Sequence, residues 1–288
     1  MEHTNIFREY LLMVIKKAKK HTWVQSAFFI SLLIFLGCAT TENQETVVQP
    51  VVPQEKILQV GVTPTSPPTI FLENDRVVGL ETDFANALAE SIGKKARFVI
   101  LAWKDLIPAL LEKRIDIIMS GMSITEMRES RISFTSPYLN AGQMALVRMP
   151  DLQFFPTAAA IKKTQSRVGF IEGTTGGFLV AQDFPLTNRK IPFPSSSRAI
   201  QALSEERIDI FIDDAPVIWW KAATQEKGGL ARIPILLTEE QLAWGVRRDE
   251  TELLKSANLF LETWKGDGRL KRAIKKWMPP VPDERIPD

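Results

Sequence analysis

Histidine and cysteine are almost missing from this sequence. Two of the 288 residues are histidine and one is cysteine, and His3, His21 and Cys38 all lie near the N-terminus. Histidine is the usual general base near neutral pH and the commonest metal ligand. The remaining chain therefore argues against Ser-His-Asp hydrolases, Cys-His enzymes and most zinc or iron sites. We expect no metal and no cofactor.

A hydrophobic run long enough to span a membrane is also lacking. The apolar run 23–36 is shorter than the roughly 20 residues that a membrane-spanning helix needs. Lysines precede it and Gly37-Cys38 follow it, which resembles a bacterial lipoprotein signal peptide, although Phe35 stands where leucine is usual. The alternative is a signal anchor with an incidental cysteine. We expect residues 1–37 to be removed and Cys38 to be lipidated.

The segment after Cys38 is polar and contains several prolines. Residues 38–55 show no lasting helical or strand period, which predicts a flexible tether between the lipid anchor and a folded body. The net charge of +2 gives no reason to expect nucleic acid. The expected location is the periplasm or the outer face of the cell membrane, with membrane contact through the lipid anchor only.

Strand and helix patterns alternate beyond the tether. Apolar, β-rich runs at 57–62, 97–101 and 115–119 predict strands, and apolar residues at helical spacing predict helices at 82–92 and 103–112. This β-α-β-α-β order favours a mainly parallel sheet covered by helices on both faces.

An internal repeat indicates two lobes of like construction. Residues 107–119 (IPALLEKRIDIIM) align with residues 200–212 (IQALSEERIDIFI), and both copies predict a helix, a turn and a strand. In open α/β sheets, ligands bind beyond the carboxyl ends of the strands. Ser120-Gly121 and Asp213-Asp214 follow the two copies, so we expect them to border a binding cleft.

Together the motifs resemble family 3 (amino-acid) solute-binding proteins of ABC transporters. The resemblance spans about 57–278 and includes SGMSITEMRESRISFTSPY, VGFIEGTTG, RIDIFIDDAPV and WKGDGRLKRAIKKWMP. It implies a two-lobed α/β type II periplasmic-binding-protein fold, with a mostly parallel sheet in each lobe and a two-stranded hinge. The implied first lobe is 56–147 plus 241–288, and the implied second lobe is 148–240.

Arg128 is the main candidate for the ligand carboxylate. Ser123-Ile124-Thr125-Glu126 has a capping-box pattern, which places Arg128 in the first turn of the following helix. A helix N-terminus and a guanidinium both favour an anion. The resemblance implies that Arg128 binds an α-carboxylate, whereas the alternative is a surface pair with Glu129.

Asp214 is the complementary candidate, for an α-ammonium. It follows an apolar strand, where a carboxylate is costly unless it is paired. Its neighbour Asp213 supplies the alternative, because one of the two aspartates is suited to cap a helix near Ala215. The resemblance favours Asp214 as the ligand contact.

The resemblance implies further ligand contacts of several kinds. Thr63 and Ser66 stand where relatives often have an acid and an aromatic residue, which favours a neutral polar or modestly apolar ligand over a strongly cationic one, although Glu172 could supply a charge. Trp103 is expected to pack on the ligand side chain. The alternative is that it packs in the hydrophobic core or as a staple before the helix. The remaining predicted contacts are Ser120, Gly121, Ser123, Glu172 and Thr175.

The resulting hypothesis is an extracytoplasmic, monomeric lipoprotein that captures an amino-acid-like molecule and delivers it to an ABC transporter permease. Two alternatives remain. One is a periplasmic dehydratase for prephenate-like or arogenate-like acids, in which Glu172 would be the general acid. The other is a stand-alone amino-acid sensor without a transporter.

Overall fold

The computed structural model describes residues 55–224, 229–278 and 281–287. They belong to one compact unit, Pro53–Asp288. The predicted signal peptide, the lipidation of Cys38 and nearly all of the tether lie outside the described residues. Within the described part, no helix combines the length and the apolar character that a membrane span requires.

The first of two five-stranded sheets has the strand order β5-β1-β6-β15-β7. β1 is parallel to β5 and β6, whereas β15 is antiparallel to β6 and β7. The bounds are β1 Ile57–Val62, β5 Lys95–Ile100, β6 Ile117–Ile118, β7 Ser133–Phe134 and β15 Gly245–Val246. The strand predicted at 57–62 is observed with the same bounds, while the one predicted at 115–119 is shorter.

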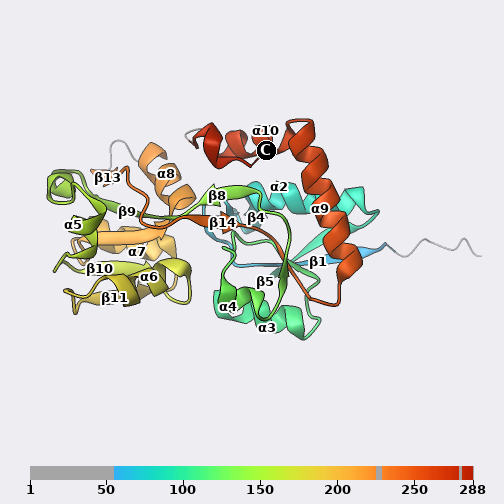
Figure 1. The fold of residues 1–288 in the computed structure, drawn as a ribbon, viewed down its shortest axis with the longest axis horizontal. Helices are drawn as coiled ribbons and strands as arrows, with labels where there is room; N and C mark the ends of the chain where they lie inside the picture. The colour runs from blue at the N-terminus through green and yellow to red at the C-terminus, as the bar shows by residue number, and fades with distance from the viewer. Residues whose placement is uncertain (1–54, 225–228, 279–280, 288) are drawn as a thin grey trace, which may run out of the picture. The chain divides into compact units, whose positions relative to one another are not determined.

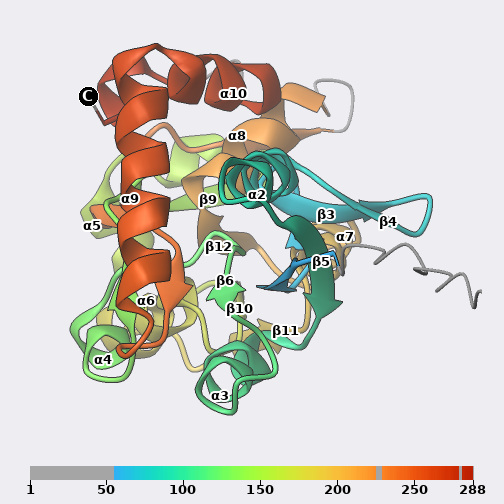
Figure 2. The same ribbon diagram turned by 90° about the vertical axis from the view of Figure 1, so that its right-hand side faces the viewer.

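Helices cover both faces of this sheet (Figure 1). Leu58 of β1 and Phe84 of α2 belong to one core cluster, whereas Ile118 of β6 and Leu110 of α3 belong to another. Figure 2 shows α9 and α10 beside α2. The bounds are α2 Leu80–Ser91, η1 Trp103–Asp105, α3 Leu106–Leu111, α4 Glu126–Glu129, α9 Thr251–Gly266, α10 Arg269–Trp277 and η3 Asp283–Arg285.

The second sheet has the order β11-β10-β12-β9-β13. β10 is parallel to β11 and β12, and β9 is antiparallel to β12 and β13. Successive residues of β12 face opposite sides, since Phe211 and Ile212 belong to different core clusters. The bounds are β9 Gln143–Arg148, β10 Val168–Ile171, β11 Lys190–Phe193, β12 Ile210–Asp214, β13 Leu230–Arg232, η2 Met149–Phe154, α5 Ala158–Lys162, α6 Thr175–Asp183, α7 Ser196–Ser204 and α8 Ala215–Thr224.

Two short antiparallel strands, β8 (Leu139–Ala141) and β14 (Glu240–Leu242), connect the sheets (Figure 1). The chain passes from β7 through β8 into β9, and returns from β13 through β14 into β15. Because β9 pairs with β12, residues 143–147 belong to the second sheet, although the predicted division assigns them to the first lobe. A separate three-stranded sheet contains β2 Thr65–Ser66, β3 Ile70–Glu73 and β4 Arg76–Val78.

The repeated segments form the same helix-turn-strand unit in both sheets. Lys113 and Glu206 occupy the same position in the repeat, and both adopt positive φ angles, 60° and 56°. Asp116 and Asp209 also correspond. Asp116 accepts a hydrogen bond of 2.9 Å from the backbone N–H of Gln59 in β1, and Asp209 accepts one of 2.8 Å from that of Arg167, the residue before β10. The likeness seen in the sequence is therefore a likeness of backbone and hydrogen bonding.

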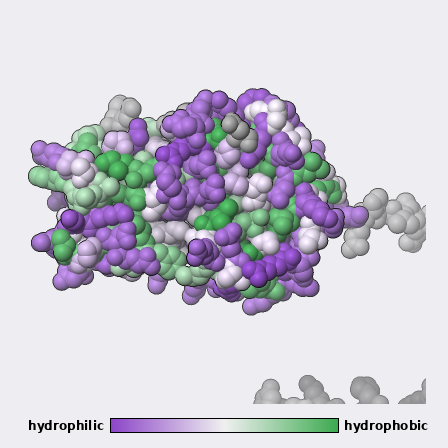
Figure 3. Space-filling view, in the orientation of Figure 1, coloured by the Kyte–Doolittle hydropathy of each residue, from purple (hydrophilic) through white to green (hydrophobic). Residues whose placement is uncertain are grey.

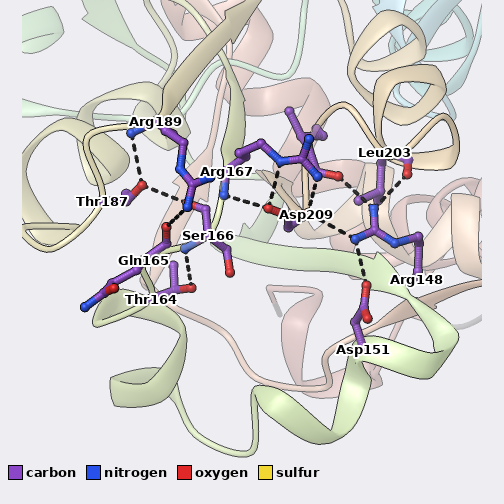
Figure 4. Close-up of polar contacts among 11 residues, drawn as sticks. Arg148, Asp151, Thr164, Gln165, Ser166, Arg167, Thr187, Arg189, Leu203 and Asp209 are labelled. Atoms are coloured by element: carbon purple, nitrogen blue, oxygen red, sulfur yellow. Dashed lines mark hydrogen bonds and ion pairs between the residues drawn. The ribbon is translucent and has the colours of Figure 1, made fainter.

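Each unit is also held by an arginine from a neighbouring antiparallel strand or the residue after it. Arg247 follows β15, and its Nη1 donates to two carbonyl oxygens of the first unit at 3.2 Å and 2.7 Å. Arg148 ends β9 and makes the corresponding bonds at 3.0 Å and 2.7 Å. Figure 4 shows Arg148 together with Asp209 and Asp151, its ion-pair partners. The accepting residues are Leu110 and Ile115 in the first unit and Leu203 and Ile208 in the second.

The face drawn in Figure 3 is largely hydrophilic, with hydrophobic residues in small groups among the polar ones. Most large apolar side chains lie instead in the core clusters.

Candidate functional site

A cavity of about 930 Å³ is lined by residues that follow strands of both sheets. The structure places all the predicted ligand contacts along its wall. They are Thr63, Trp103, Ser120, Gly121, Ser123, Arg128, Glu172, Thr175 and Asp214. The volume lies within the range of common small-molecule sites, about 300–1,000 Å³. The residues are thus collected in one place, and their contact with a ligand stays a prediction.

Arg128 lies in α4 with its side chain almost wholly buried. The side chain is held by a hydrogen bond of 2.7 Å from Nη1 to the Ser123 carbonyl oxygen. Its guanidinium carbon lies 5.3 Å from the centre of the Trp103 ring, in reach of a cation–π contact. Burial lowers the pKa of Arg128, and the Asp214 and Glu240 carboxylates oppose that change. The guanidinium stays charged and has donors to spare.

The helix that contains Arg128 begins later than the capping-box pattern predicts. Thr125, rather than Ser123, is the N-cap, and its hydroxyl accepts a hydrogen bond of 3.3 Å from the Arg128 backbone N–H. Ser123 forms a β-bridge with Leu242, so the chain is still extended at that point. The predicted capping role of Ser123 is therefore wrong, and its hydroxyl has a different partner.

That partner is Glu240, which sequence reasoning missed. Ser123 Oγ and Thr175 Oγ1 both donate to Glu240 Oε2, at 2.6 Å and 2.8 Å. Thr238 Oγ1 and Gln143 Nε2 donate to Oε1, at 2.7 Å and 3.2 Å. Glu240 is the first residue of β14, so one carboxylate joins the connecting strand to the segments of both sheets.

The two aspartates at the end of β12 have different partners. Asp213 is buried and accepts hydrogen bonds from Ser196 Oγ at 2.6 Å and from the Asp214 backbone N–H at 2.9 Å. Asp214 is only half-buried, and its Oδ1 accepts a hydrogen bond of 2.6 Å from Gln143 Nε2. Of the two residues, Asp214 is the more exposed to solvent.

Both aspartates bind protons more readily than usual. Burial raises the pKa of Asp213 to about 6, and hydrogen bonds from Ser196 and the Asp214 backbone limit the rise. Burial, followed by the Asp213 and Glu240 carboxylates, raises the pKa of Asp214 well above its ordinary value. A cation beside Asp214 would relieve this crowding of negative charge.

Hydrogen bonds to neighbouring segments fix Thr63, Ser120 and Gly121 in the cavity wall. The Thr63 backbone N–H donates to Ser120 Oγ at 2.9 Å, and Thr63 Oγ1 donates to the Leu101 carbonyl oxygen at 2.9 Å. Gly121 has a φ of 68°, a conformation that glycine adopts without strain. Its backbone N–H donates to Glu81 Oε1 at 2.9 Å, and so points away from the cavity.

A hydrogen bond connects the two sides of the cavity at Trp103. Its indole Nε1 donates to the Gly173 carbonyl oxygen at 2.8 Å. Gly173 follows Glu172 in the loop before α6, where Thr174 is the N-cap and accepts a hydrogen bond from the Gly177 backbone N–H at 3.2 Å. The loop that was predicted from EGTTG therefore positions Trp103 as well as Thr175.

No cluster of histidine, cysteine, aspartate and glutamate residues in the described part of the chain has the arrangement of a metal site. The charged groups around the cavity are instead carboxylates, Lys104 and Arg128. They suit a small polar molecule with a negative end and a positive end.

Residues 58–280 match the sequence profile of the bacterial extracellular solute-binding proteins, family 3. The chain belongs to this family. A family relative in Escherichia coli (strain K12), ABC transporter arginine-binding protein 1, is 31% identical over 232 residues, which cover 78% of this chain and 91% of the relative. The prediction from the motifs is thereby confirmed.

Solved structures of related proteins have the same fold. An ancestral arginine-binding protein bound to arginine has a TM-score of 0.72 and 30% identity, covering 77% of this chain and 98% of that one. The ancestral amino acid-binding protein AncCDT-1, described as a precursor of cyclohexadienyl dehydratase, has a TM-score of 0.71 and 30% identity, covering 77% and 95%. The two-lobed α/β prediction is confirmed, and this family 3 protein has a substrate-binding role.

Proposed function

We propose that this protein captures one free α-amino acid in the cavity and delivers it to the permease of an ABC transporter. Arg128 binds the α-carboxylate through its guanidinium, and Asp214 binds the α-ammonium. The observation that carries the proposal is that these two groups, from different segments of the chain, line one cavity of suitable size. Burial disfavours the charged form of each group, lowering the pKa of Arg128 and raising that of Asp214.

The proposed mechanism is closure around the ligand. Hydrogen bonds connect segments of both sheets in the arrangement described. One joins Trp103 to Gly173, and two others join Ser123 and Thr175 to Glu240. A ligand that contacts both sides stabilises this closed form by differential binding. Delivery then requires only that the permease favours the open form.

The ligand side chain is proposed to be polar and neutral. Thr63 and Ser66 supply hydroxyl groups, and Lys104 lies on the same cavity wall, where it repels a second cation. The Thr63 hydroxyl already donates its hydrogen bond to the Leu101 carbonyl oxygen, so it can only accept a hydrogen bond from a ligand. An amide side chain such as that of glutamine can donate to this hydroxyl.

Unmodified protein tests the proposal most directly. Calorimetric titration with each free amino acid identifies a ligand, and its N-acetyl and C-amide derivatives then remove one charged end at a time. We expect both derivatives to bind at least 100-fold more weakly, because each leaves a buried charge unpaired. Equal binding of either derivative would show that the corresponding end is not recognised.

We propose further that the protein is exported as a monomer, cleaved before Cys38 and anchored by lipid, and that it is not an enzyme. The relative described as a dehydratase precursor makes the enzymatic alternative worth excluding. Incubation with prephenate should yield no aromatic product in the ultraviolet. Mass spectrometry of the purified protein should show a chain that begins at a diacylated Cys38, whereas an uncleaved signal anchor would retain residues 1–37.

A further inference from the structure

Glu81 is a carboxylate buried in the core beneath the proposed site. It lies in the first turn of α2 with its side chain wholly inaccessible to solvent. None of the ion pairs among the described residues includes it. Such a group is costly unless hydrogen bonds compensate for the lost hydration. Its partners therefore indicate why the position is acidic.

Three donors converge on this carboxylate. The Gly121 backbone N–H and the Tyr138 hydroxyl donate to Oε1 at 2.9 Å and 2.7 Å. Trp244 Nε1 donates to Oε2 at 2.8 Å. Gly121 lines the cavity, Tyr138 immediately precedes β8, and Trp244 follows β14 after one intervening residue. One side chain thus fixes the cavity loop and the adjoining ends of both connecting strands.

The ionised and protonated forms of Glu81 cannot hold these donors equally well. The carboxylate accepts hydrogen bonds from all three donors at once, whereas a carboxylic acid has an O–H group that must itself donate to an acceptor. The Gly121 and Trp244 N–H groups offer no acceptor, and Tyr138 accepts only if its hydroxyl hydrogen turns away. Protonation therefore releases at least one of the three contacts.

The surroundings leave the ionised and protonated forms of Glu81 close in free energy near neutral pH. Burial raises the pKa of Glu81 to about 7, and the hydrogen bonds from Gly121, Tyr138 and Trp244 act to lower it. Tyr138 is the titratable group in contact with it, and burial and Glu81 raise the pKa of that tyrosine, so it stays neutral. Asp83, on the same helix, pairs with Lys276 instead.

We propose that Glu81 is a positioning residue for ligand capture, whose ionised carboxylate holds the Gly121 loop and the ends of β8 and β14 in the binding arrangement. Ligand binding and loss of the Glu81 proton are then thermodynamically coupled, so that each favours the other. The inference rests on the proposed function of the cavity. It adds a residue that does not touch the ligand and makes affinity depend on pH.

Calorimetry in buffers of different ionisation enthalpy measures this coupling as protons released on binding. For the wild-type protein we expect net proton release near pH 7 and an affinity that rises several-fold from pH 6 to pH 8. Glu81→Gln should bind more weakly and lose most of the release and of the pH dependence. Asp83→Asn, the same change of charge on the same helix, should behave like the wild type.

The aspartates of the cavity also titrate, and the variants separate their contribution. If Glu81→Gln releases as many protons as the wild type, the aspartates carry the effect and the inference is overturned. Tyr138→Phe supplies an independent test should Glu81→Gln not fold. Losing that hydroxyl should move the midpoint of the affinity profile to higher pH, and an unmoved midpoint contradicts the inference. A wild-type protein that binds no amino acid at any pH would instead refute the proposed function.

Discussion

Ser123 and Glu240 are far apart in the chain, yet the Ser123 hydroxyl donates a hydrogen bond of 2.6 Å to the Glu240 carboxylate. Thr175, at the start of α6, donates to the same carboxylate oxygen at 2.8 Å. These two donors come from segments associated with different sheets, and Glu240 lies on the strand that returns from one sheet to the other. The bonds require both segments to be near the connecting strand at the same time.

Glu240→Gln should therefore weaken ligand binding without removing any direct ligand contact. A neutral amide keeps one acceptor oxygen but replaces the other with donors that face hydroxyl groups. Losing one or two charge-assisted hydrogen bonds of the closed form corresponds to about 2 kcal/mol, or roughly 30-fold in affinity. Calorimetry measures this effect, and small-angle scattering of the unliganded variant should show a larger radius of gyration.

Glu239→Gln is the matched control for Glu240. Glu239 is the preceding residue, and it pairs with Arg285 at an exposed site instead of facing the cavity. Exposed ion pairs contribute about 0–1 kcal/mol to stability, so binding should change little. Equal effects of the two substitutions would refute a specific role for Glu240.

Arg128→Ala should weaken amino-acid binding by about 3–5 kcal/mol, because a desolvated ligand carboxylate loses its charged partner. Arg131→Ala is the control, since Arg131 is an exposed arginine that follows the same short helix after one intervening residue. Titration calorimetry with the best ligand compares the two variants. An unchanged dissociation constant in Arg128→Ala would remove Arg128 from the proposed site.

Glu81 should also make protein stability depend on pH. Its pKa is about 7 in the folded protein against an ordinary value of 4.5, so the folded state binds this proton more tightly than the unfolded chain does. The favourable contribution is present below pH 4.5 and is lost as the pH rises through 7, a change of roughly 3 kcal/mol for such a shift.

Urea unfolding of wild type and Glu81→Gln at pH 5 and pH 8 measures that contribution. The free energy of unfolding of the wild type, relative to that of the variant, should fall between the two pH values. Taking the difference between the proteins cancels the other titrating groups that they share. A difference that is the same at pH 5 and pH 8 would mean that Glu81 does not titrate in this range.

Arg247→Met should destabilise the first repeated unit by about 3 kcal/mol, since the buried guanidinium donates to two backbone carbonyl oxygens that would lose their partner. Arg148→Met should cost less, because the Arg148 side chain is 20% exposed, against 7% for Arg247, and water can reach part of the gap. Urea unfolding of both variants provides the comparison, and the reverse order would contradict this account.

The sequence predicts the fold well, since apolar runs and an internal repeat define units that fold locally. It also brings Arg128 and Asp214 to the same cavity, because both lie in motifs that follow strands, and strand ends meet at one edge of a sheet. Their exposure and partners require the structure. The predicted signal peptide and the lipidation of Cys38 lie outside the described residues and remain predictions.

Glu240 and Glu81 escape sequence analysis for a physical reason. Each is held by donors that are distant in the chain, such as Ser123 and Thr175 for Glu240 and Trp244 for Glu81. Neither has a local motif, and a glutamate beside polar residues is usually solvated. The capping prediction for Ser123 failed similarly, because pairing with β14 keeps that residue extended.

The repeated units end differently at one equivalent position. Ser120 follows the first unit and Asp213 follows the second, and both face the cavity. An uncharged acceptor in one copy thus corresponds to a carboxylate in the other, while Arg128 is found only beside the first. A zwitterionic ligand in the proposed site therefore has one favourable orientation. In the reverse orientation its carboxylate would face the aspartates and its ammonium would face Arg128.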